Sequence, residues 1–141
     1  MKTVAALLGL WQQLYLHIPL PGGQRSGDKG RRAQLQVMMQ FIHANFNRQI
    51  TLQEIAQSVH ISESSALQLF RRGIHLSPVA YLIQYRLKRA ADLLASTNKT
   101  VAAIAYESGF SDAGYFCRTF RKFYGQTATE YRTSQADRSA P

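Results

Sequence analysis

Residues 100–108 read Thr-Val-Ala-Ala-Ile-Ala-Tyr-Glu-Ser, and residues 51–59 read Thr-Leu-Gln-Glu-Ile-Ala-Gln-Ser-Val. Both stretches contain a threonine, then an aliphatic residue, then the dipeptide Ile-Ala, at an offset of 49 residues along the chain. Further on, Phe70-Arg71-Arg72 recurs as Phe120-Arg121-Lys122 at an offset of 50. Two copies of one pattern indicate an internal duplication, and they are too few for a solenoid of stacked repeats.

Each copy is expected to form a helix, a tight turn and a second helix. Thr51 and Thr100 are N-cap residues that begin the first helices, while Ser62 and Asp112 begin the second ones. Gly109 suits the turn of the second copy, because glycine adopts a positive φ without steric cost. This pattern is typical of a helix-turn-helix unit, whose second helix enters a DNA major groove.

The rest of the chain also shows helical patterns. Ser77-Pro78 predicts a long helix over residues 78–96, because a cap residue precedes proline at the first helical position. Apolar residues at helical spacing follow Leu35, and Thr127 with Glu130 forms a capping box for a short final helix. Strand-like alternation between turn signals is absent from the sequence, so we predict an all-α fold.

Composition divides the chain into four segments. Residues 1–18 carry apolar residues at heptad spacing, which indicates a helix too short to be stable alone. This helix either pairs with a second copy of itself or folds back on its own domain. Residues 19–33 are glycine-rich and basic, as is typical of a flexible linker. Residues 34–132 contain both copies of the repeat, and residues 133–141 are expected to be a disordered tail.

Charge and residue types restrict the function. The formal net charge of +9 favours a polyanionic partner, either nucleic acid or an anionic membrane surface. The sequence has no apolar run long enough to span a membrane. Its single cysteine, Cys117, excludes an internal disulfide, and the four histidines lack metal-ligand spacing. Because we find no paired nucleophile and base and no phosphate-cradling glycine loop, we expect no enzyme activity, metal or cofactor.

The second copy and the helix before it resemble a known family. The matching residues are Tyr81-Leu82, Arg86-Leu87, Ala90, Leu93-Leu94, Ile104-Ala105, Gly109-Phe110, Asp112, Tyr115-Phe116, Phe120-Arg121-Lys122, Gly125 and Tyr131-Arg132. Their pattern resembles the AraC/XylS family of bacterial transcription regulators over about residues 34–132. The resemblance implies an all-α, seven-helix domain in which a long linker helix joins two helix-turn-helix motifs. It also implies that the extra helix in residues 1–18 is similar to the dimerising helix of family members.

The first copy departs from the family's usual pattern at its turns. His60 and His75 stand where the family usually has glycine, and Ala128 stands where the final helix often has proline. Gln68 replaces an arginine that is common in the first recognition helix. Histidine tolerates a positive φ less well than glycine, which leaves open whether the turn at His75 keeps the family's conformation.

Helical facing gives the candidate base-contacting residues, because the apolar residues of each recognition helix must face inward. The outward residues expected to contact bases are Ser64, Leu67, Gln68, Ala113, Gly114 and Arg118. Gln68 suits adenine, and Arg118 suits the O6 and N7 atoms of guanine. Alternatively, Leu67 is an edge of the core, and Arg118 contacts a phosphate or a surface carboxylate. The expected phosphate-contacting residues are Thr51, Arg71, Arg72, Thr100, Arg121 and Lys122.

These observations predict a sequence-specific DNA-binding transcription regulator. The resemblance implies a bacterial protein in the cytoplasm at the nucleoid and favours an activator, while the sequence itself does not distinguish activation from repression. The helix over residues 78–96 would be about 28 Å long at 1.5 Å per residue, against roughly 34 Å between successive major-groove faces. One monomer is therefore expected to insert two recognition helices into adjacent major grooves. Double-stranded DNA is the expected partner, with RNA polymerase implied by the resemblance and a second copy expected through residues 1–18. The alternative is a helical protein–protein docking module whose basic surface recruits an acidic partner.

Overall fold

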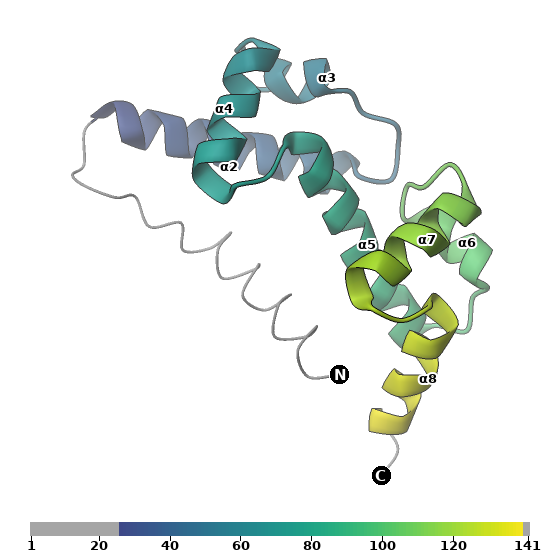
Figure 1. Cartoon of the computed structure of the whole chain (residues 1–141). Coiled ribbons are helices and arrows are strands. Elements are labelled where there is room, and N and C mark those ends of the chain that lie inside the picture. The colour runs from purple at the N-terminus through teal and green to yellow at the C-terminus, as the bar shows by residue number, and fades with distance from the viewer. Residues whose placement is uncertain (1–25, 140–141) are drawn as a thin grey trace. The chain divides into compact units, whose positions relative to one another are not determined.

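The structure is a computed structural model that describes residues 26–139 (Figure 1). Every regular element in this range is a helix, and there are seven. They are α2 (Ser26–Asn45), α3 (Leu52–Gln57), α4 (Glu63–Ile74), α5 (Pro78–Ser96), α6 (Val101–Glu107), α7 (Ala113–Tyr124) and α8 (Ala128–Ser139). The all-α prediction and the seven-helix domain are thus confirmed. The extra helix predicted within residues 1–18 lies outside the described residues.

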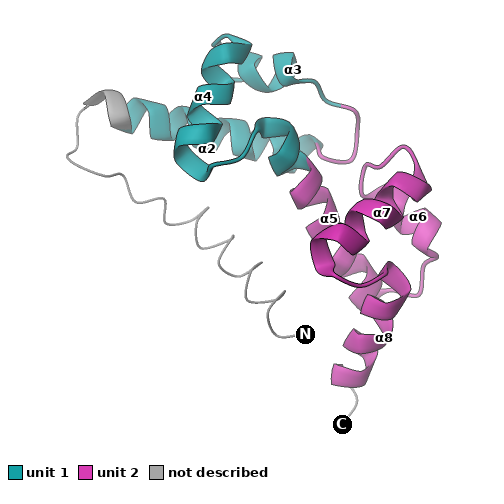
Figure 2. Cartoon of the chain, in the orientation of Figure 1, with its two compact units in different colours: residues 1–45, 50–82 teal, residues 46–49, 83–141 magenta. Residues whose placement is uncertain are grey.

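The chain divides into two compact units, each containing one copy of the repeat (Figure 2). Among the described residues, the first unit comprises residues 26–45 and 50–82, and so holds α2, α3, α4 and the first turn of α5. The second unit comprises residues 46–49 and the chain from Ile83 onward, with α6, α7 and α8. The helix α5 belongs to both units, since its residues are divided after Leu82.

The helices begin at the predicted cap residues. The hydroxyl oxygens of Thr51, Ser62 and Thr100 each accept a hydrogen bond from a backbone N–H three residues later, at 3.1 Å. Ser77 does the same at the start of α5, ahead of Pro78 at its first position. Each bond pairs one of the backbone N–H groups that a helix start otherwise leaves without a partner.

The capping box at the start of α8 is complete. The backbone N–H of Glu130 donates to Thr127 Oγ1 at 3.1 Å, and the backbone N–H of Thr127 donates to Glu130 Oε1 at 2.9 Å. The hydrogen bond from the Thr127 backbone holds the pKa of the Glu130 carboxyl below its ordinary value. The final helix therefore begins where the sequence predicted.

The core of the first unit forms where α2 packs against α4 and α5. Met38 and Ile42 of α2 are fully buried, as is Phe70 of α4, whose ring meets the edge of Tyr81 at 5.8 Å between centroids. Gly73 permits this packing, because a Cβ at this position would overlap the side chain of Leu35.

The core of the second unit is aromatic. Phe110 lies 5.1 Å from Phe116 between ring centroids, Phe116 lies 5.6 Å from Phe120, and Phe120 stacks on Tyr124 at 4.4 Å. Three of these rings lie four residues apart on α7, so they form one buried stripe along that helix. This stripe fixes which face of α7 remains exposed.

Two segment boundaries differ from the predictions. Residues 26–33, predicted as part of a flexible linker over 19–33, form the first turns of α2. Residues 133–139, predicted as part of a disordered tail, form the last turns of α8. Both segments are poor in large apolar residues, but each continues a helix whose other turns are packed. Adding a residue to an existing helix costs far less than starting one, and lysine, arginine, alanine and glutamine propagate helices well.

Candidate nucleic-acid interface

Both helix-turn-helix turns are closed in the same way. The backbone N–H of Ile61 donates to the carbonyl oxygen of Ala56 at 3.1 Å, and that of Phe110 donates to Ala105 at 3.0 Å. Ala56 and Ala105 are buried, so each pair of helices crosses at a small residue. The first helices, α3 and α6, thereby hold α4 and α7 in equivalent positions within their own units.

Histidine and glycine adopt the same backbone conformation at the equivalent turns. The φ angles are +58° at His60 and +97° at Gly109 in the two inner turns. They are +60° at His75 and +75° at Gly125, the residues that end α4 and α7. The question left open for His75 is therefore settled, because it is left-handed like its glycine counterpart. The left-handed conformation of His75 lowers the stability of the first unit by about 1 kcal/mol relative to glycine at this position.

In the first recognition helix, α4, the buried residues are Ala66, Phe70 and Ile74. The opposite face carries the exposed side chains of Ser64, Leu67, Gln68 and Arg71. Leu67 is 36% exposed although it is apolar, so it lies at the boundary between the core and solvent. Leu69, on the side of α4 next to the core, is half-buried. The predicted exposed face is thus present, while the base contacts assigned to it stay predictions.

In the second recognition helix, α7, the exposed residues include Gly114, Arg118 and Arg121. Ala113 is half-buried at the first position of the helix, so it is less exposed than the facing argument implied. Tyr115 was not among the predicted site residues, yet it is 43% exposed, with its ring 6.2 Å from Phe110. A facing argument misses such a residue because an aromatic ring is long enough to cover the core at one edge and meet solvent at the other.

The exposed faces of α4 and α7 correspond position by position at an offset of 50. Ser64 corresponds to Gly114, and Gln68 corresponds to Arg118. Each recognition helix therefore presents one small and one long polar residue four positions apart, which places them on the same side of the helix. The two helices share geometry but differ in chemistry.

The predicted phosphate-contacting residues fall into two groups. Thr51 and Thr100 are exposed at the starts of α3 and α6, where their hydroxyls already cap the helices. The cations are exposed in the last turns of the recognition helices; they are Arg71, Arg72, Arg121 and Lys122. A cation in the last turn also stabilises its own helix by interacting with the helix dipole, so these residues have a structural role beside any contact with phosphate.

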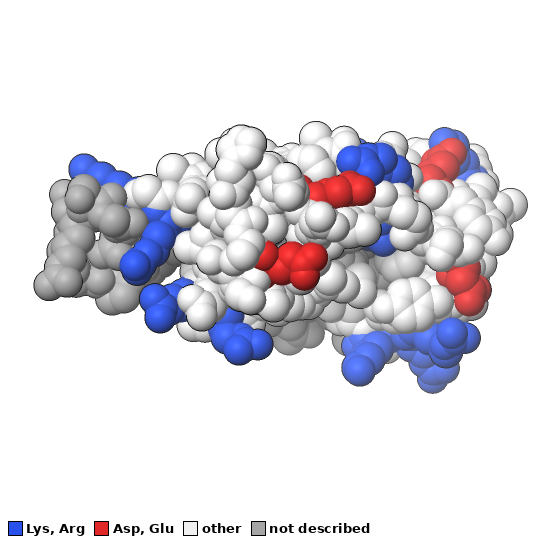
Figure 3. Space-filling view, turned by 90° about the horizontal axis from the view of Figure 1, so that it is seen from above, with Lys and Arg blue, Asp and Glu red and all other residues white. Residues whose placement is uncertain are grey.

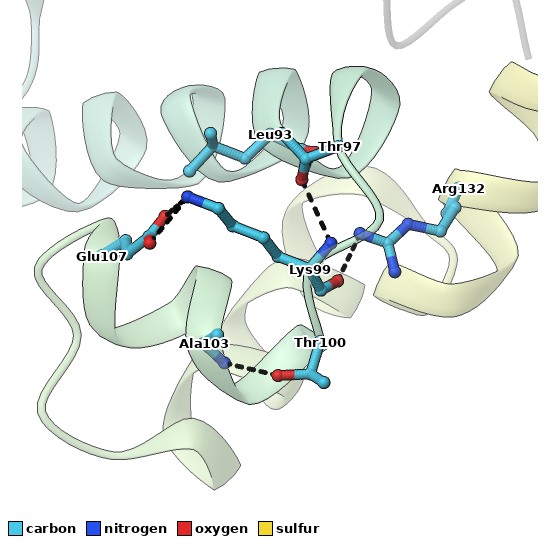
Figure 4. Close-up of polar contacts among 7 residues, drawn as sticks. All are labelled: Leu93, Thr97, Lys99, Thr100, Ala103, Glu107 and Arg132. Carbon is cyan, nitrogen blue, oxygen red and sulfur yellow. Dashed lines mark hydrogen bonds and ion pairs between the residues drawn. The ribbon is translucent and has the colours of Figure 1, made fainter.

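Other basic residues of the domain are engaged within the protein. Arg132 donates from Nε to the carbonyl oxygen of Leu94 at 3.1 Å, which ties α8 to the end of α5. It also donates from Nη2 to the carbonyl oxygen of Lys99 at 2.7 Å (Figure 4). Lys99 Nζ lies 2.8 Å from a carboxylate oxygen of Glu107, as Figure 4 also shows. These contacts stabilise the second unit. Because the ammonium group of Lys99 is paired with a carboxylate, it attracts a polyanion less strongly than an unpaired cation would.

In contrast, the cations of α4 and α7 form no ion pair with any residue in the described part of the chain; they are Arg71, Arg72, Arg118, Arg121 and Lys122. On the face shown in Figure 3, basic side chains stand in several separate groups, and some of these groups lie beside acidic side chains. Both recognition helices therefore carry positive charge that is available to a polyanion.

Arg86 is a positioning residue whose role the sequence pattern did not indicate, although it belongs to the motif shared with the AraC/XylS family. It is 8% exposed and donates from Nε to the carbonyl oxygen of Phe46 and from Nη2 to that of Arg48, both at 2.8 Å. Burial lowers the pKa of its guanidinium. Gly109 lies beside this contact, because a Cβ there would be 2.7 Å from Arg86 Nε. The sequence offered one signal of its burial, since Arg86 directly precedes Leu87, which faces the core on the long helix.

Comparison with known proteins identifies the family. The model of a helix-turn-helix domain family matches residues 55–134. The lactose operon transcription activator of Staphylococcus xylosus is 33% identical over 98 residues, which cover 70% of this chain. A probable AraC family transcriptional regulator from Rhodopseudomonas palustris is 30% identical, with a TM-score of 0.67 and coverage of 73% of this chain and 97% of that one. An AraC-type DNA-binding domain from Chromobacterium violaceum is 29% identical, with a TM-score of 0.72 and coverage of 77% and 96%.

The fold and the paired recognition helices define a helix-turn-helix protein of the kind that binds DNA. The chain belongs to the AraC/XylS family of transcription regulators and contains its C-terminal DNA-binding domain. Family membership agrees with the prediction that the chain is not an enzyme, and it does not favour the docking module.

The chain spans about a third of the length of the Staphylococcus activator and less than half of two other curated relatives. Among the residues that the structure describes, no helix is both long and apolar enough to cross a membrane. The same residues bring no three metal-ligating side chains together.

Proposed function

We propose that this protein regulates transcription by binding a specific DNA sequence through the exposed faces of α4 and α7. One observation carries the proposal: two helices in equivalent helix-turn-helix positions expose the same face, and the cations on these helices have no ion-pair partner among the described residues. Cations without an ion-pair partner attract the phosphate backbone of DNA, and polar side chains on the same face form hydrogen bonds with base edges.

The roles divide along each recognition helix. Arg118 donates two hydrogen bonds to guanine O6 and N7, and Gln68 pairs with adenine N6 and N7. Leu67 touches a thymine methyl group and Ser64 bonds to a neighbouring base edge. The small residues Ala113 and Gly114 permit close approach of α7 to the duplex.

Phosphate contacts fix the position of the domain without reading sequence. In this role, the proposal assigns the threonine caps and the cations at the ends of the recognition helices, which are Thr51, Arg71, Arg72, Thr100, Arg121 and Lys122. The N-termini of α3 and α6 add a favourable dipole for phosphate beside the two threonines.

The two recognition helices are proposed to occupy adjacent major grooves of one duplex. Support comes from α5, which is continuous over 19 residues and is therefore about 28 Å long. Successive major-groove faces are roughly 34 Å apart, so a helix of this length suits one turn of DNA. A single chain then binds two half-sites without needing a second copy.

The proposal extends to activation and to partners. The Staphylococcus relative is an activator of a lactose operon, which favours activation over repression here. Activation implies contact with RNA polymerase, and action on chromosomal DNA places the protein in the cytoplasm at the nucleoid.

A homodimer through residues 1–18 is also part of the proposal. Sedimentation of the chain with and without these residues tests it, and an equal oligomeric state for both would contradict it.

Selection of bound duplexes from a random pool tests the main proposal. We expect one enriched sequence, and Arg118→Ala should lower affinity for it by about 1–3 kcal/mol while relaxing one base position. Affinity should also fall linearly on a logarithmic scale as salt rises. A pool without enrichment, together with binding that is independent of salt, would contradict the proposal. A uniform loss across operator variants would reassign Arg118 to phosphate.

A further inference from the structure

The first turn of α7 brings an acidic and a basic side chain to the same space. The Asp112 carboxylate accepts a hydrogen bond from the backbone N–H of Gly114 at 2.8 Å and so caps the helix. A Cβ on Gly114 would lie 3.2 Å from Asp112 Oδ1 and 3.4 Å from Arg118 Nη1. The guanidinium of Arg118 therefore folds back over Gly114. It and the Asp112 carboxylate both border the space that a side chain at position 114 would fill.

The first recognition helix lacks this arrangement. Its cap residue, Ser62, is neutral and bonds to the backbone N–H of Ser65, one position further into the helix than in α7. Ser64 stands in place of the glycine, and Gln68 stands in place of the arginine. The exposed faces correspond, but only the second helix combines a negative cap, a missing side chain and a cation.

A free arginine side chain has many rotamers, and fixing it on a base costs conformational entropy. A carboxylate that faces the guanidinium favours rotamers directed toward the start of the helix, where recognition helices contact base edges. The carboxylate forms no ion pair with Arg118 within 4.0 Å, so the guanidinium donors stay available. Because Gly114 has no side chain, those rotamers remain sterically open.

We propose that Asp112 and Gly114 are positioning residues that orient Arg118 and thereby set the strength of the guanine preference at one base pair. This inference rests on the proposed function, in which Arg118 reads guanine. It goes beyond that function by assigning part of the sequence specificity to Asp112, which does not contact the base, and to the absence of a side chain at Gly114.

The test compares base preferences of the full chain on duplexes that differ only at the base pair read by Arg118. Asp112→Asn keeps an oxygen that can cap α7 but removes the charge. The preference for guanine should fall by up to about 5-fold, as expected for losing one exposed charge interaction. Affinity for unrelated duplex DNA should not fall, because removing a negative charge cannot weaken attraction to phosphate.

Gly114→Ala tests the steric part without changing charge. The added methyl group contacts both Asp112 and Arg118, so the guanine preference should fall while the helix itself becomes no less stable. Glu63→Gln is the matched control, since it removes an equal charge from the first turn of the other recognition helix. It should leave the guanine preference of Arg118 unchanged. Thermal unfolding of each variant verifies that the domain folds.

Arg118→Ala is the reference variant that separates the positioning role of Asp112 and Gly114 from the proposed DNA-binding function. In the Arg118→Ala background, neither Asp112→Asn nor Gly114→Ala should change the remaining base preference, because positioning acts only through the arginine. An unchanged guanine preference in both single variants, with a clear loss in Arg118→Ala, would overturn the positioning role and leave the proposed function intact. If Arg118→Ala itself leaves every base preference unchanged, the positioning role is overturned together with the assignment of Arg118 to guanine, whereas the proposed function is overturned only by a random pool that shows no enrichment.

Discussion

Arg86 Nε donates a hydrogen bond to the backbone carbonyl oxygen of Phe46 at 2.8 Å, joining residues that are 40 positions apart in the sequence. The same guanidinium pairs with the carbonyl oxygen of Arg48 through Nη2. One buried cation thus satisfies two backbone groups of residues 46–49 and holds this segment within the second unit, beside the turn at Gly109. The second helix-turn-helix depends on a contact that lies outside the motif itself.

Replacing Arg86 should therefore destabilise the protein although the residue is far from the proposed base contacts. Arg86→Gln should lower the free energy of unfolding by about 2–4 kcal/mol, because it leaves two carbonyl oxygens without their charged donor. Urea unfolding measures this loss. Arg89→Gln is the matched control on the same helix, and breaking its exposed pair with Asp92 should cost less than about 1 kcal/mol. Equal effects of the two variants would contradict the assigned role.

Gly109 should tolerate no side chain. Its φ of +97° is unfavourable for any other residue, and a Cβ would overlap the carbonyl oxygen of Phe46. Gly109→Ala should cost about 2–5 kcal/mol, combining backbone strain with the overlap. Gly30→Ala in α2 is the control, since a Cβ there contacts nothing within 4 Å and should stabilise the helix by about 0.5–1 kcal/mol. A similar melting temperature for both variants would be inconsistent with the structure.

The end of α4 should become more stable when its histidine is replaced. His75 has a φ of +60°, and its side chain forms no hydrogen bond with any residue in the described part of the chain that could offset this strain. His75→Gly should raise the free energy of unfolding by about 0.5–1 kcal/mol. The reverse exchange at the equivalent turn, Gly125→Ala, should lower it by about 1–2 kcal/mol. Denaturant unfolding of the two variants measures the gain expected for His75→Gly and the loss expected for Gly125→Ala. A loss of stability in His75→Gly would show that the backbone of His75 is not strained.

Alkaline pH should unfold the protein partly through Tyr124. Burial raises the pKa of its phenol, and the nearby Tyr131 and Asp92 raise it further. Since an unfolded tyrosine ionises near pH 10, this contribution to stability is present below about pH 10 and is lost as the pH rises above it. Tyr124→Phe should flatten the loss of unfolding free energy as the pH rises above about 10.

The same variant should change stability little at neutral pH. The Tyr124 hydroxyl is buried and has no hydrogen-bond partner among the described residues, so removing it leaves no group newly unpaired. Tyr131→Phe is the comparison: burial also raises the pKa of Tyr131, but this side chain is half-buried, and its removal should flatten the pH profile less. Identical pH profiles for wild type and Tyr124→Phe would show that the phenol ionises normally.

Most of the fold was predictable because its signals are local. A cap residue, a following apolar stripe and a turn residue lie within a few positions of one another, and Thr51, Ser62, Thr100 and Thr127 all begin helices as expected. The exposed faces of α4 and α7 were predictable for the same reason, since helical spacing alone separates Phe116 from its exposed neighbours.

The remaining features depend on contacts between distant residues, which spacing does not encode. The pairing of Arg86 with carbonyl oxygens of residues 46–49 is one example. Another is the helical state of residues 26–33, which follows from packing of later turns of α2 and not from their own composition. The space shared by Asp112 and Arg118 depends on rotamers, so the sequence showed both residues without showing their relationship.

Protection of guanine N7 from methylation tests most directly whether α4 and α7 both enter major grooves of one duplex, as we propose. Guanine N7 faces the major groove, so a bound recognition helix shields it. On the selected duplex, we expect two protected groups centred about 10–10.5 base pairs apart. Arg118→Ala should remove protection within one group and leave the other unchanged. A single protected group, or equal weakening of both groups by Arg118→Ala, would contradict the account.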